Sequence, residues 1–171
     1  MKKLIIFVLI PIVLAGCTVQ EKVNSEIFLG RLTGVDKNIN VEKTFRTEEN
    51  YVAFISYGGA DFVLKTAEDE CFNVTSVSLT CADGKKNETF RNLVKNIVTT
   101  YCNDDTEEVI NGLSDDGNNK DFRFFSTKWY RYSAVINENG LYFSLENLKL
   151  TGETEEQLSL EHKKGAVSPK R

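Results

Sequence analysis

The chain has 171 residues, which favours a single domain, and its 41% hydrophobic and 27% charged residues are typical of a globular protein. The formal net charge is −4, and loss of the first 16 residues would leave 19 basic against 25 acidic residues, or −6. No segment carries a basic stripe, which argues against nucleic acid as a partner and against electrostatic attachment to lipid headgroups.

The N-terminus has the pattern of an export signal. Lys2 and Lys3 precede an apolar run from Leu4 to Leu14. This run is too short to span a bilayer, which takes about 20 apolar residues, and it fits the apolar core of a signal peptide. It ends in Leu14-Ala15-Gly16-Cys17, which closely resembles the lipobox of bacterial lipoproteins.

The resemblance implies that residues 1–16 are removed and that Cys17 receives a diacylglyceryl group and acyl chains such as palmitate. Residues 17–25 then form a lipidated tether. By the same resemblance, Thr18 in place of Asp favours the outer membrane, facing the periplasm, and a Gram-positive surface is the alternative. An ordinary secreted protein with an incidental cysteine is the other interpretation of this segment.

Residues 26–150 are expected to form one globular domain, followed by a polar and mobile tail over 151–171. Alternating patterns on both sides of Gly58-Gly59 predict a hairpin, because a type I′ turn needs positive φ at both central residues. A second hairpin is expected between Lys128–Ile136 and Leu141–Leu150. Weaker strand patterns lie at Ile27–Thr33, Ile39–Phe45, Cys71–Cys81 and Phe122–Ser126.

One segment has helical periodicity instead, and it predicts a helix from Glu88 to Tyr101 with Asn87 as its N-cap. A shorter helix is expected at Glu107–Gly112, capped by Asp105 or Thr106. The expected fold class is therefore α+β, with a mainly antiparallel β-sheet and one principal amphipathic helix packed on it. The apolar positions of the principal helix are Phe90, Leu93, Val94, Ile97, Val98 and Tyr101.

With Cys17 assigned to lipid, Cys71, Cys81 and Cys102 remain, and an exported domain is expected to hold one disulfide and one free thiol. A straight strand would put Cys71 and Cys81 about 33 Å apart, whereas a bridge allows about 7 Å between Cα atoms. The apolar parity switches near Thr75-Ser76, and a turn or bulge there could join the two. We favour Cys71–Cys81; the alternative is Cys81–Cys102. Zinc is not expected, because there is no CxxC pair.

Few residues suggest catalysis. The single histidine, His162, lies in the charged tail, which offers no rigid support for a nucleophile–histidine pair. Glu68-Asp69-Glu70 and Asp104-Asp105 could supply the opposed carboxylates of a glycoside hydrolase, although exposed loop charge is the favoured interpretation. The acidic stretch 115–121 lacks EF-hand spacing, which favours a loop over a calcium site. We expect no cofactor and no metal.

The segment 122–143 is rich in aromatic residues. Trp129 and Arg131 share one strand parity, and Tyr130 and Tyr132 share the other, so either both faces are covered or one presents a ring and an Arg to solvent. Burial is the favoured interpretation. The alternative is a partner-binding face at Trp129 and Arg131, because Trp, Tyr and Arg are enriched in binding hot spots.

These features favour a lipid-anchored envelope lipoprotein that binds a protein partner without catalysis, as an inhibitor, an immunity or exclusion factor, or an accessory subunit of an envelope machine. The alternatives are a carboxylate-dependent hydrolase of cell-wall glycan and a structural envelope lipoprotein. The expected contacts are the membrane, through lipid on Cys17, and an envelope protein of unknown identity.

Overall fold

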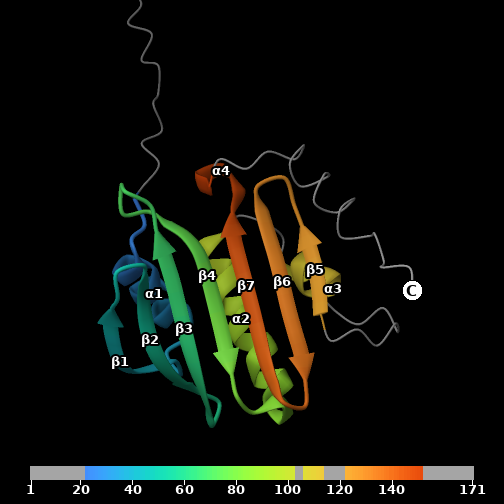
Figure 1. Cartoon of the computed structure of the whole chain (residues 1–171). Coiled ribbons are helices and arrows are strands. Elements are labelled where there is room, and N and C mark those ends of the chain that lie inside the picture. The colour runs from blue at the N-terminus through green and yellow to red at the C-terminus, as the bar shows by residue number, and fades with distance from the viewer. Residues whose placement is uncertain (1–21, 103–105, 114–121, 152–171) are drawn as a thin grey trace, which may run out of the picture.

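A computed structural model describes residues 22–102, 106–113 and 122–151. Its centre is one antiparallel sheet of seven strands in the order β1-β2-β3-β4-β7-β6-β5, with helices on one side (Figure 1). The α+β prediction is thereby confirmed. The strands are β1 (Asn40–Arg46), β2 (Asn50–Tyr57), β3 (Ala60–Glu68), β4 (Val74–Cys81), β5 (Phe122–Ser126), β6 (Tyr130–Asn137) and β7 (Gly140–Asn147).

The first helix, α1 (Ser25–Val35), replaces the strand that was predicted at Ile27–Thr33. Asn24 caps the helix, because its side-chain oxygen accepts a hydrogen bond from the Ile27 amide at 2.8 Å. The strand prediction was wrong because a short apolar run fits both periods, and the cap favours the helix. The buried residues of α1 lie on one helical face: Ser25, Phe28, Leu29 and Leu32.

Both predicted hairpins are present. Gly58 and Gly59 have φ values of 56° and 70°, so the turn between β2 and β3 is the type I′ turn that their sequence predicts. A side chain at Gly58 would also meet the methyl group of Thr89 at 2.7 Å. β6 and β7 form the second hairpin, but β7 ends at Asn147, and the chain continues as the short helix α4 (Leu148–Thr151) rather than as strand.

The principal helix is α2 (Asn87–Tyr101), and α3 (Thr106–Gly112) follows it, close to both predicted ranges. The predicted cap of α2 is wrong. A short 3₁₀ turn, η1 (Gly84–Lys86), leads into the helix, and Lys86 is the N-cap residue. The Asn87 side chain instead accepts a hydrogen bond from Arg91 Nε at 3.2 Å.

The core lies between α1, α2 and α3 and one face of the sheet (Figure 1). Tyr132, Phe28, Phe62, Phe90 and Phe143 are its largest fully buried side chains. The opposite face is covered by no helix among the described residues. We call it the open face.

The cysteines do not pair as expected. β4 is continuous, and the parity switch comes from a β-bulge that leaves Thr75 as the extra residue opposite β3. The eight residues of β4 place Cys81 about 23 Å beyond Val74, so Cys71 and Cys81 lie at opposite ends of the strand.

Cys102 is not bonded to Cys81 either. It follows α2, whose fifteen residues extend over about 22 Å, and the neighbouring Tyr101 hydroxyl donates a hydrogen bond to the Val74 carbonyl. Both pairings expected from the sequence are therefore wrong. All three cysteines are free thiols, of which Cys71 is exposed and the other two are buried.

One end of the sheet receives the start of the described chain. Val23 accepts a hydrogen bond from the Val74 amide at 2.9 Å, which holds the segment after Lys22 against the beginning of β4. The β3–β4 loop, the β5–β6 turn and α4 lie at this same end, which we call the Lys22 end (Figure 1). None of the helices in the described part of the chain combines the length and the apolarity that crossing a bilayer requires.

Candidate functional site

The strand register builds an apolar row across the open face. Phe54 pairs with Val63, Val63 with Thr80 and Thr80 with Tyr142, so the row passes from β2 to β7. It continues through Val135 of β6 to β5. Because paired residues of antiparallel strands point to the same face, these side chains are neighbours. The apolar row consists of Phe54, Val63, Tyr142, Val135 and Phe122, interrupted by Thr80.

A second row, beside the first, carries hydroxyl groups at its centre. Ser78 pairs with Ser144, and Ser144 pairs with Ser133. The hydroxyls of Ser133 and Ser144 are hydrogen-bonded at 2.7 Å. An aromatic ring stands at one end of this hydroxyl row, where Phe124 pairs with Ser133, and a lysine stands at the other, where Lys65 pairs with Ser78.

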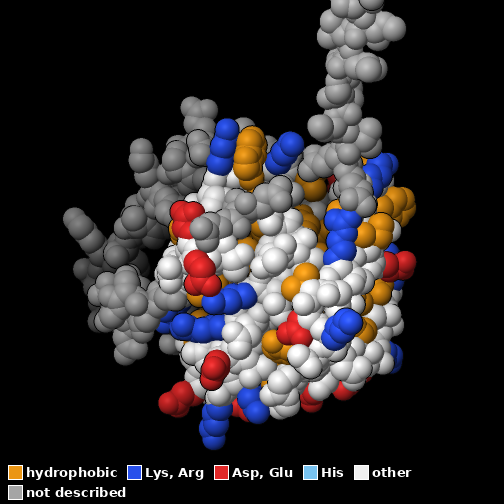
Figure 2. Space-filling view, turned by 180° about the vertical axis from the view of Figure 1, so that it is seen from behind, with side chains coloured by type: hydrophobic (Ala, Val, Ile, Leu, Met, Phe, Trp, Pro, Cys, Tyr) orange, Lys and Arg blue, Asp and Glu red, His pale blue; other side chains and the backbone are white. Residues whose placement is uncertain are grey.

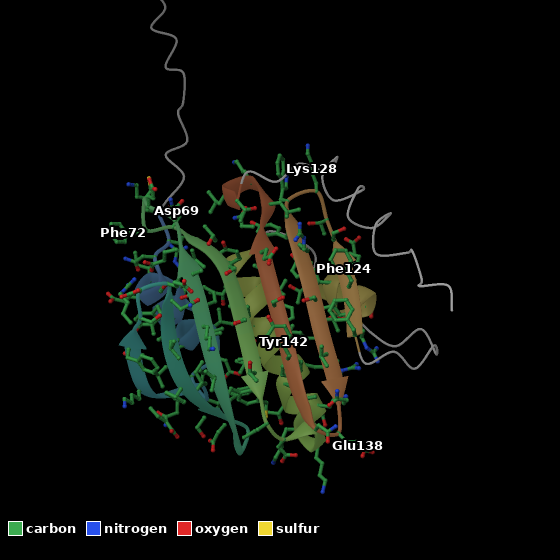
Figure 3. All side chains as sticks on the ribbon, in the orientation of Figure 1. Asp69, Phe72, Phe124, Lys128, Glu138 and Tyr142 are labelled. Atoms are coloured by element: carbon green, nitrogen blue, oxygen red, sulfur yellow. The ribbon has the colours of Figure 1, made fainter. Side chains whose placement is uncertain are left out.

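Several rings of the open face are accessible to solvent. The exposed fraction is 38% for Phe54, 57% for Phe122 and 37% for Tyr142. Figure 3 shows Tyr142 and Phe124 on the side of the sheet away from the helices. A shallow hollow of about 270 Å³ adjoins Tyr142. The open face therefore offers a broad surface with apolar and hydroxyl groups side by side.

The two residues predicted to bind a partner are both outside the core. Trp129 lies in the β5–β6 turn and is 46% exposed, so the favoured burial interpretation is wrong for this ring. Arg131 lies on the open face, where it forms an ion pair with Glu146 at 3.2 Å. Trp129 instead lies at the Lys22 end, between two lysines. Their role in partner binding stays a prediction.

The burial interpretation is right for the inward-facing residues of β6, Tyr130 and Tyr132. Tyr132 is fully buried and Tyr130 is half-buried, and both point towards the helices. Their rings form part of an aromatic cluster with Phe28 and Tyr101, linked by centroid distances of 5.8–6.3 Å. This cluster fixes the inner face, so the neighbouring residues of β6 must face outward.

Two acidic residues at the β3–β4 loop accept hydrogen bonds that stabilise the fold. Glu68 accepts hydrogen bonds from the Ser25 amide at 2.7 Å and from Arg46 at 2.6 Å. Asp69 accepts from the amides of Cys71 at 2.9 Å and Asn73 at 2.8 Å, which closes the loop.

Both carboxylates are held in the charged form. Burial alone would raise the pKa of Glu68, but hydrogen bonds from Arg46 and Ser25 outweigh it and keep the pKa below its ordinary value. The pKa of Asp69 is likewise lowered, because hydrogen bonds from Asn73 and Cys71 outweigh its burial. A glycosidase acid needs a raised pKa, which neither group has.

Other candidates from the sequence lie outside the described residues: Cys17, His162, Asp104-Asp105 and the acidic stretch 115–121. Within residues 22–102, 106–113 and 122–151, no three His, Cys, Asp or Glu side chains are close enough together to hold a metal ion.

Sequence reasoning missed the apolar row. Its members lie in five separate strands, and only the strand order brings β4 beside β7. A partial signal was present in β2, where Phe54 has the parity opposite to the buried Ala53 and Ile55. Comparison with protein-family models, with curated proteins and with solved structures finds no match to this chain.

Proposed function

We propose that this protein is an envelope lipoprotein, anchored by lipid on Cys17, that binds a protein partner through the open face of its sheet. Binding involves no catalytic step. The partner-bound protein acts as an inhibitor, an immunity or exclusion factor, or an accessory subunit of an envelope machine.

The apolar row is the observation that carries this proposal. One-sided antiparallel sheets normally present polar residues to water on their free face. Here five apolar side chains form a row that reaches from β2 to the edge strand β5. Exposed apolar side chains gathered on one face are typical of protein-binding faces, and a central Tyr is among the residues enriched in hot spots.

The hydroxyl row adds the polar part of such a surface. Ser78, Ser144 and Ser133 can donate and accept hydrogen bonds, which orient a partner without the desolvation cost of charged groups. The alternative of a carboxylate-dependent hydrolase receives no support from Glu68 and Asp69, since both are engaged in structural hydrogen bonds.

Site-specific cross-linking in intact cells tests this proposal. A photoreactive phenylalanine in place of Tyr142 should give one defined adduct with an envelope protein. The same group in place of Ile27 serves as the matched control, because Ile27 is 41% exposed but lies on α1, across the sheet from the open face. Equal adducts from both positions, or none from 142, would overturn the open face as the binding surface.

The anchor has its own test. Labelled palmitate should be incorporated into the wild-type chain, and the Cys17→Ala variant should remain unlabelled and uncleaved. Equal labelling of the two chains would overturn the lipoprotein proposal and leave partner binding at the open face standing.

A further inference from the structure

Trp129 projects from the corner of the sheet where β5 turns into β6. Its carbonyl accepts a hydrogen bond from the Leu148 amide at 2.9 Å, which fixes the turn against α4. The ring itself is 46% exposed. Lys128 Nζ lies 4.6 Å from the ring centroid and Lys149 Nζ lies 5.9 Å from it. Figure 2 shows, at the top of the molecule, a hydrophobic side chain standing out between two basic ones.

Folding therefore creates a basic aromatic group that the sequence does not show. Lys128 and Lys149 lie in separate segments, on the two sides of the β6–β7 hairpin, and they meet only because Tyr130 pairs with Asn147. We call Trp129, Lys128 and Lys149 the Trp129 corner.

The composition of this corner fits a phospholipid headgroup layer better than a protein. Trp is enriched at membrane–water interfaces, where its ring lies among headgroups, and lysine side chains extend to the phosphates. Protein-binding hot spots favour Arg beside Trp, and lysine is depleted there. Each lysine near an anionic membrane surface also adds about 1 kcal/mol of attraction.

The position of the corner in the chain leads to the same partner. Lys22 follows Cys17 by five residues, which can span at most about 18 Å when fully extended. The hydrogen bond between Val23 and Val74 fixes this segment at the Lys22 end of the sheet, the same end as the Trp129 corner. A lipid on Cys17 would therefore keep this end next to the bilayer.

Charge at the Lys22 end is divided between its two sides. Glu48 and Glu49 lie in the β1–β2 turn, at the edge of the sheet far from β5 and β6. Lys128 and Lys149 lie on the other side, beside the exposed ring. Arg46 lies on the same side as Glu48 and Glu49 but is paired with Glu68, so that side keeps an acidic excess and an anionic surface should favour a tilt towards the Trp129 corner.

We propose that the Trp129 corner inserts into the phospholipid headgroup layer and orients the anchored domain on the membrane. This inference rests on the proposed lipid on Cys17. In this orientation the strands stand roughly upright on the bilayer and the open face points sideways. A partner can then reach Tyr142 without contact with lipid. In Figure 3, Lys128 lies at the Lys22 end, well away from Tyr142 on the open face.

Fluorescence of Trp129 provides the test, because the chain contains a single tryptophan. The acylated mature protein is placed in vesicles of phosphatidylethanolamine and phosphatidylglycerol whose acyl chains carry bromine close to the headgroups. We expect the bromolipid to lower the emission clearly below that in vesicles without bromine, because an interfacial ring lies among the headgroups. Unchanged emission from vesicle-bound protein would overturn the inference.

A matched variant controls for lipid contact in general. The double variant Trp129→Phe, Tyr142→Trp moves the single tryptophan to the open face and keeps an apolar ring between Lys128 and Lys149, so the corner can still insert and bromolipid should have no effect. Quenching equal to that of the wild type would show random orientation and contradict the proposal. The double variant Lys128→Gln, Lys149→Gln should show weaker quenching of Trp129 in the same bromolipid vesicles.

Palmitate incorporation separates the two proposals. A chain that is not acylated contradicts the anchor and this orientation together. An acylated, vesicle-bound chain whose Trp129 stays accessible to acrylamide contradicts only the orientation.

Discussion

Glu68 joins three segments that are distant in the sequence. Glu68 is the last residue of β3. Its carboxylate accepts a hydrogen bond from the Ser25 amide at the start of α1 and forms an ion pair with Arg46 at the end of β1. Beside it, the buried Thr66 hydroxyl donates to the Ser25 hydroxyl at 2.6 Å. These contacts hold the first helix on the sheet, so a residue that the sequence suggested as a possible acid has a structural role.

Replacing Glu68 with Gln should lower the free energy of unfolding by about 1–3 kcal/mol at pH 7, because the charged partner of Arg46 and Ser25 is lost. The folded pKa of Glu68 lies below its ordinary value of 4.5, so its contribution is complete above that value. It disappears as the pH falls through the folded pKa. Urea unfolding of the wild type and of Glu68→Gln should therefore show a difference in free energy of unfolding that becomes smaller towards pH 3.

Glu26→Gln is the control for this measurement. Glu26 lies 3.9 Å from Arg46, but its side chain is 68% exposed, and the change should stay within about 0.5 kcal/mol. A gap for Glu68→Gln that is the same at pH 3 and pH 7 would be inconsistent with the role given to its charge.

The free thiols give a second prediction at this scale. Cys71 is exposed, whereas Cys81 and Cys102 are buried, so a maleimide should modify the native protein at one position in residues 22–102. Unfolding in urea should make the other two reactive. Mass spectrometry of the modified chain checks both steps, and a Cys71–Cys81 bridge in the unreduced protein would contradict the continuous β4.

Local sequence signals predicted most elements well. Gly58-Gly59 specifies its own turn, and the apolar period of α2 fixes one helical face regardless of what packs on it. Boundaries depend more on single contacts. α1 was mistaken for a strand, and α4 for the end of one, because each is short and its apolar residues suit either structure.

The caps of the two main helices offer a direct comparison. Asn24→Ala should lower the free energy of unfolding by about 1 kcal/mol, because Asn24 accepts the Ile27 amide at the start of α1. Asn87→Ala should change it by less than about 0.5 kcal/mol, since the Asn87 side chain does not cap α2 and accepts a hydrogen bond from Arg91 on the helix surface instead. Thermal unfolding of the two variants measures the difference. Equal effects would mean that Asn87 caps α2 after all.

The candidate site belongs to the whole molecule, which explains why the sequence did not reveal it. Each of five strands contributes a single side chain to the apolar row, and alternation within a strand says nothing about its neighbours. The decisive pairing is Thr80 with Tyr142, between strands separated by α2, α3 and two further strands. The exposure of Trp129 was not predicted either, because Trp129 lies in the turn before β6, where strand parity does not decide which way a side chain points.

The same architecture separates the core from the proposed binding face. The core lies on the helix side, so an exposed side chain of the open face such as Tyr142 can change without leaving a cavity. Tyr142→Ser should lower the free energy of unfolding by less than about 1 kcal/mol.

The most direct measurement is the affinity of the partner that the cross-link at position 142 identifies. Calorimetric titration should show that Tyr142→Ser weakens its binding by about 2 kcal/mol or more, a roughly 30-fold rise in Kd, while Ile27→Ser leaves the Kd unchanged. An unchanged Kd for Tyr142→Ser, or an equal loss for Ile27→Ser, would contradict the assignment of the open face as the binding surface.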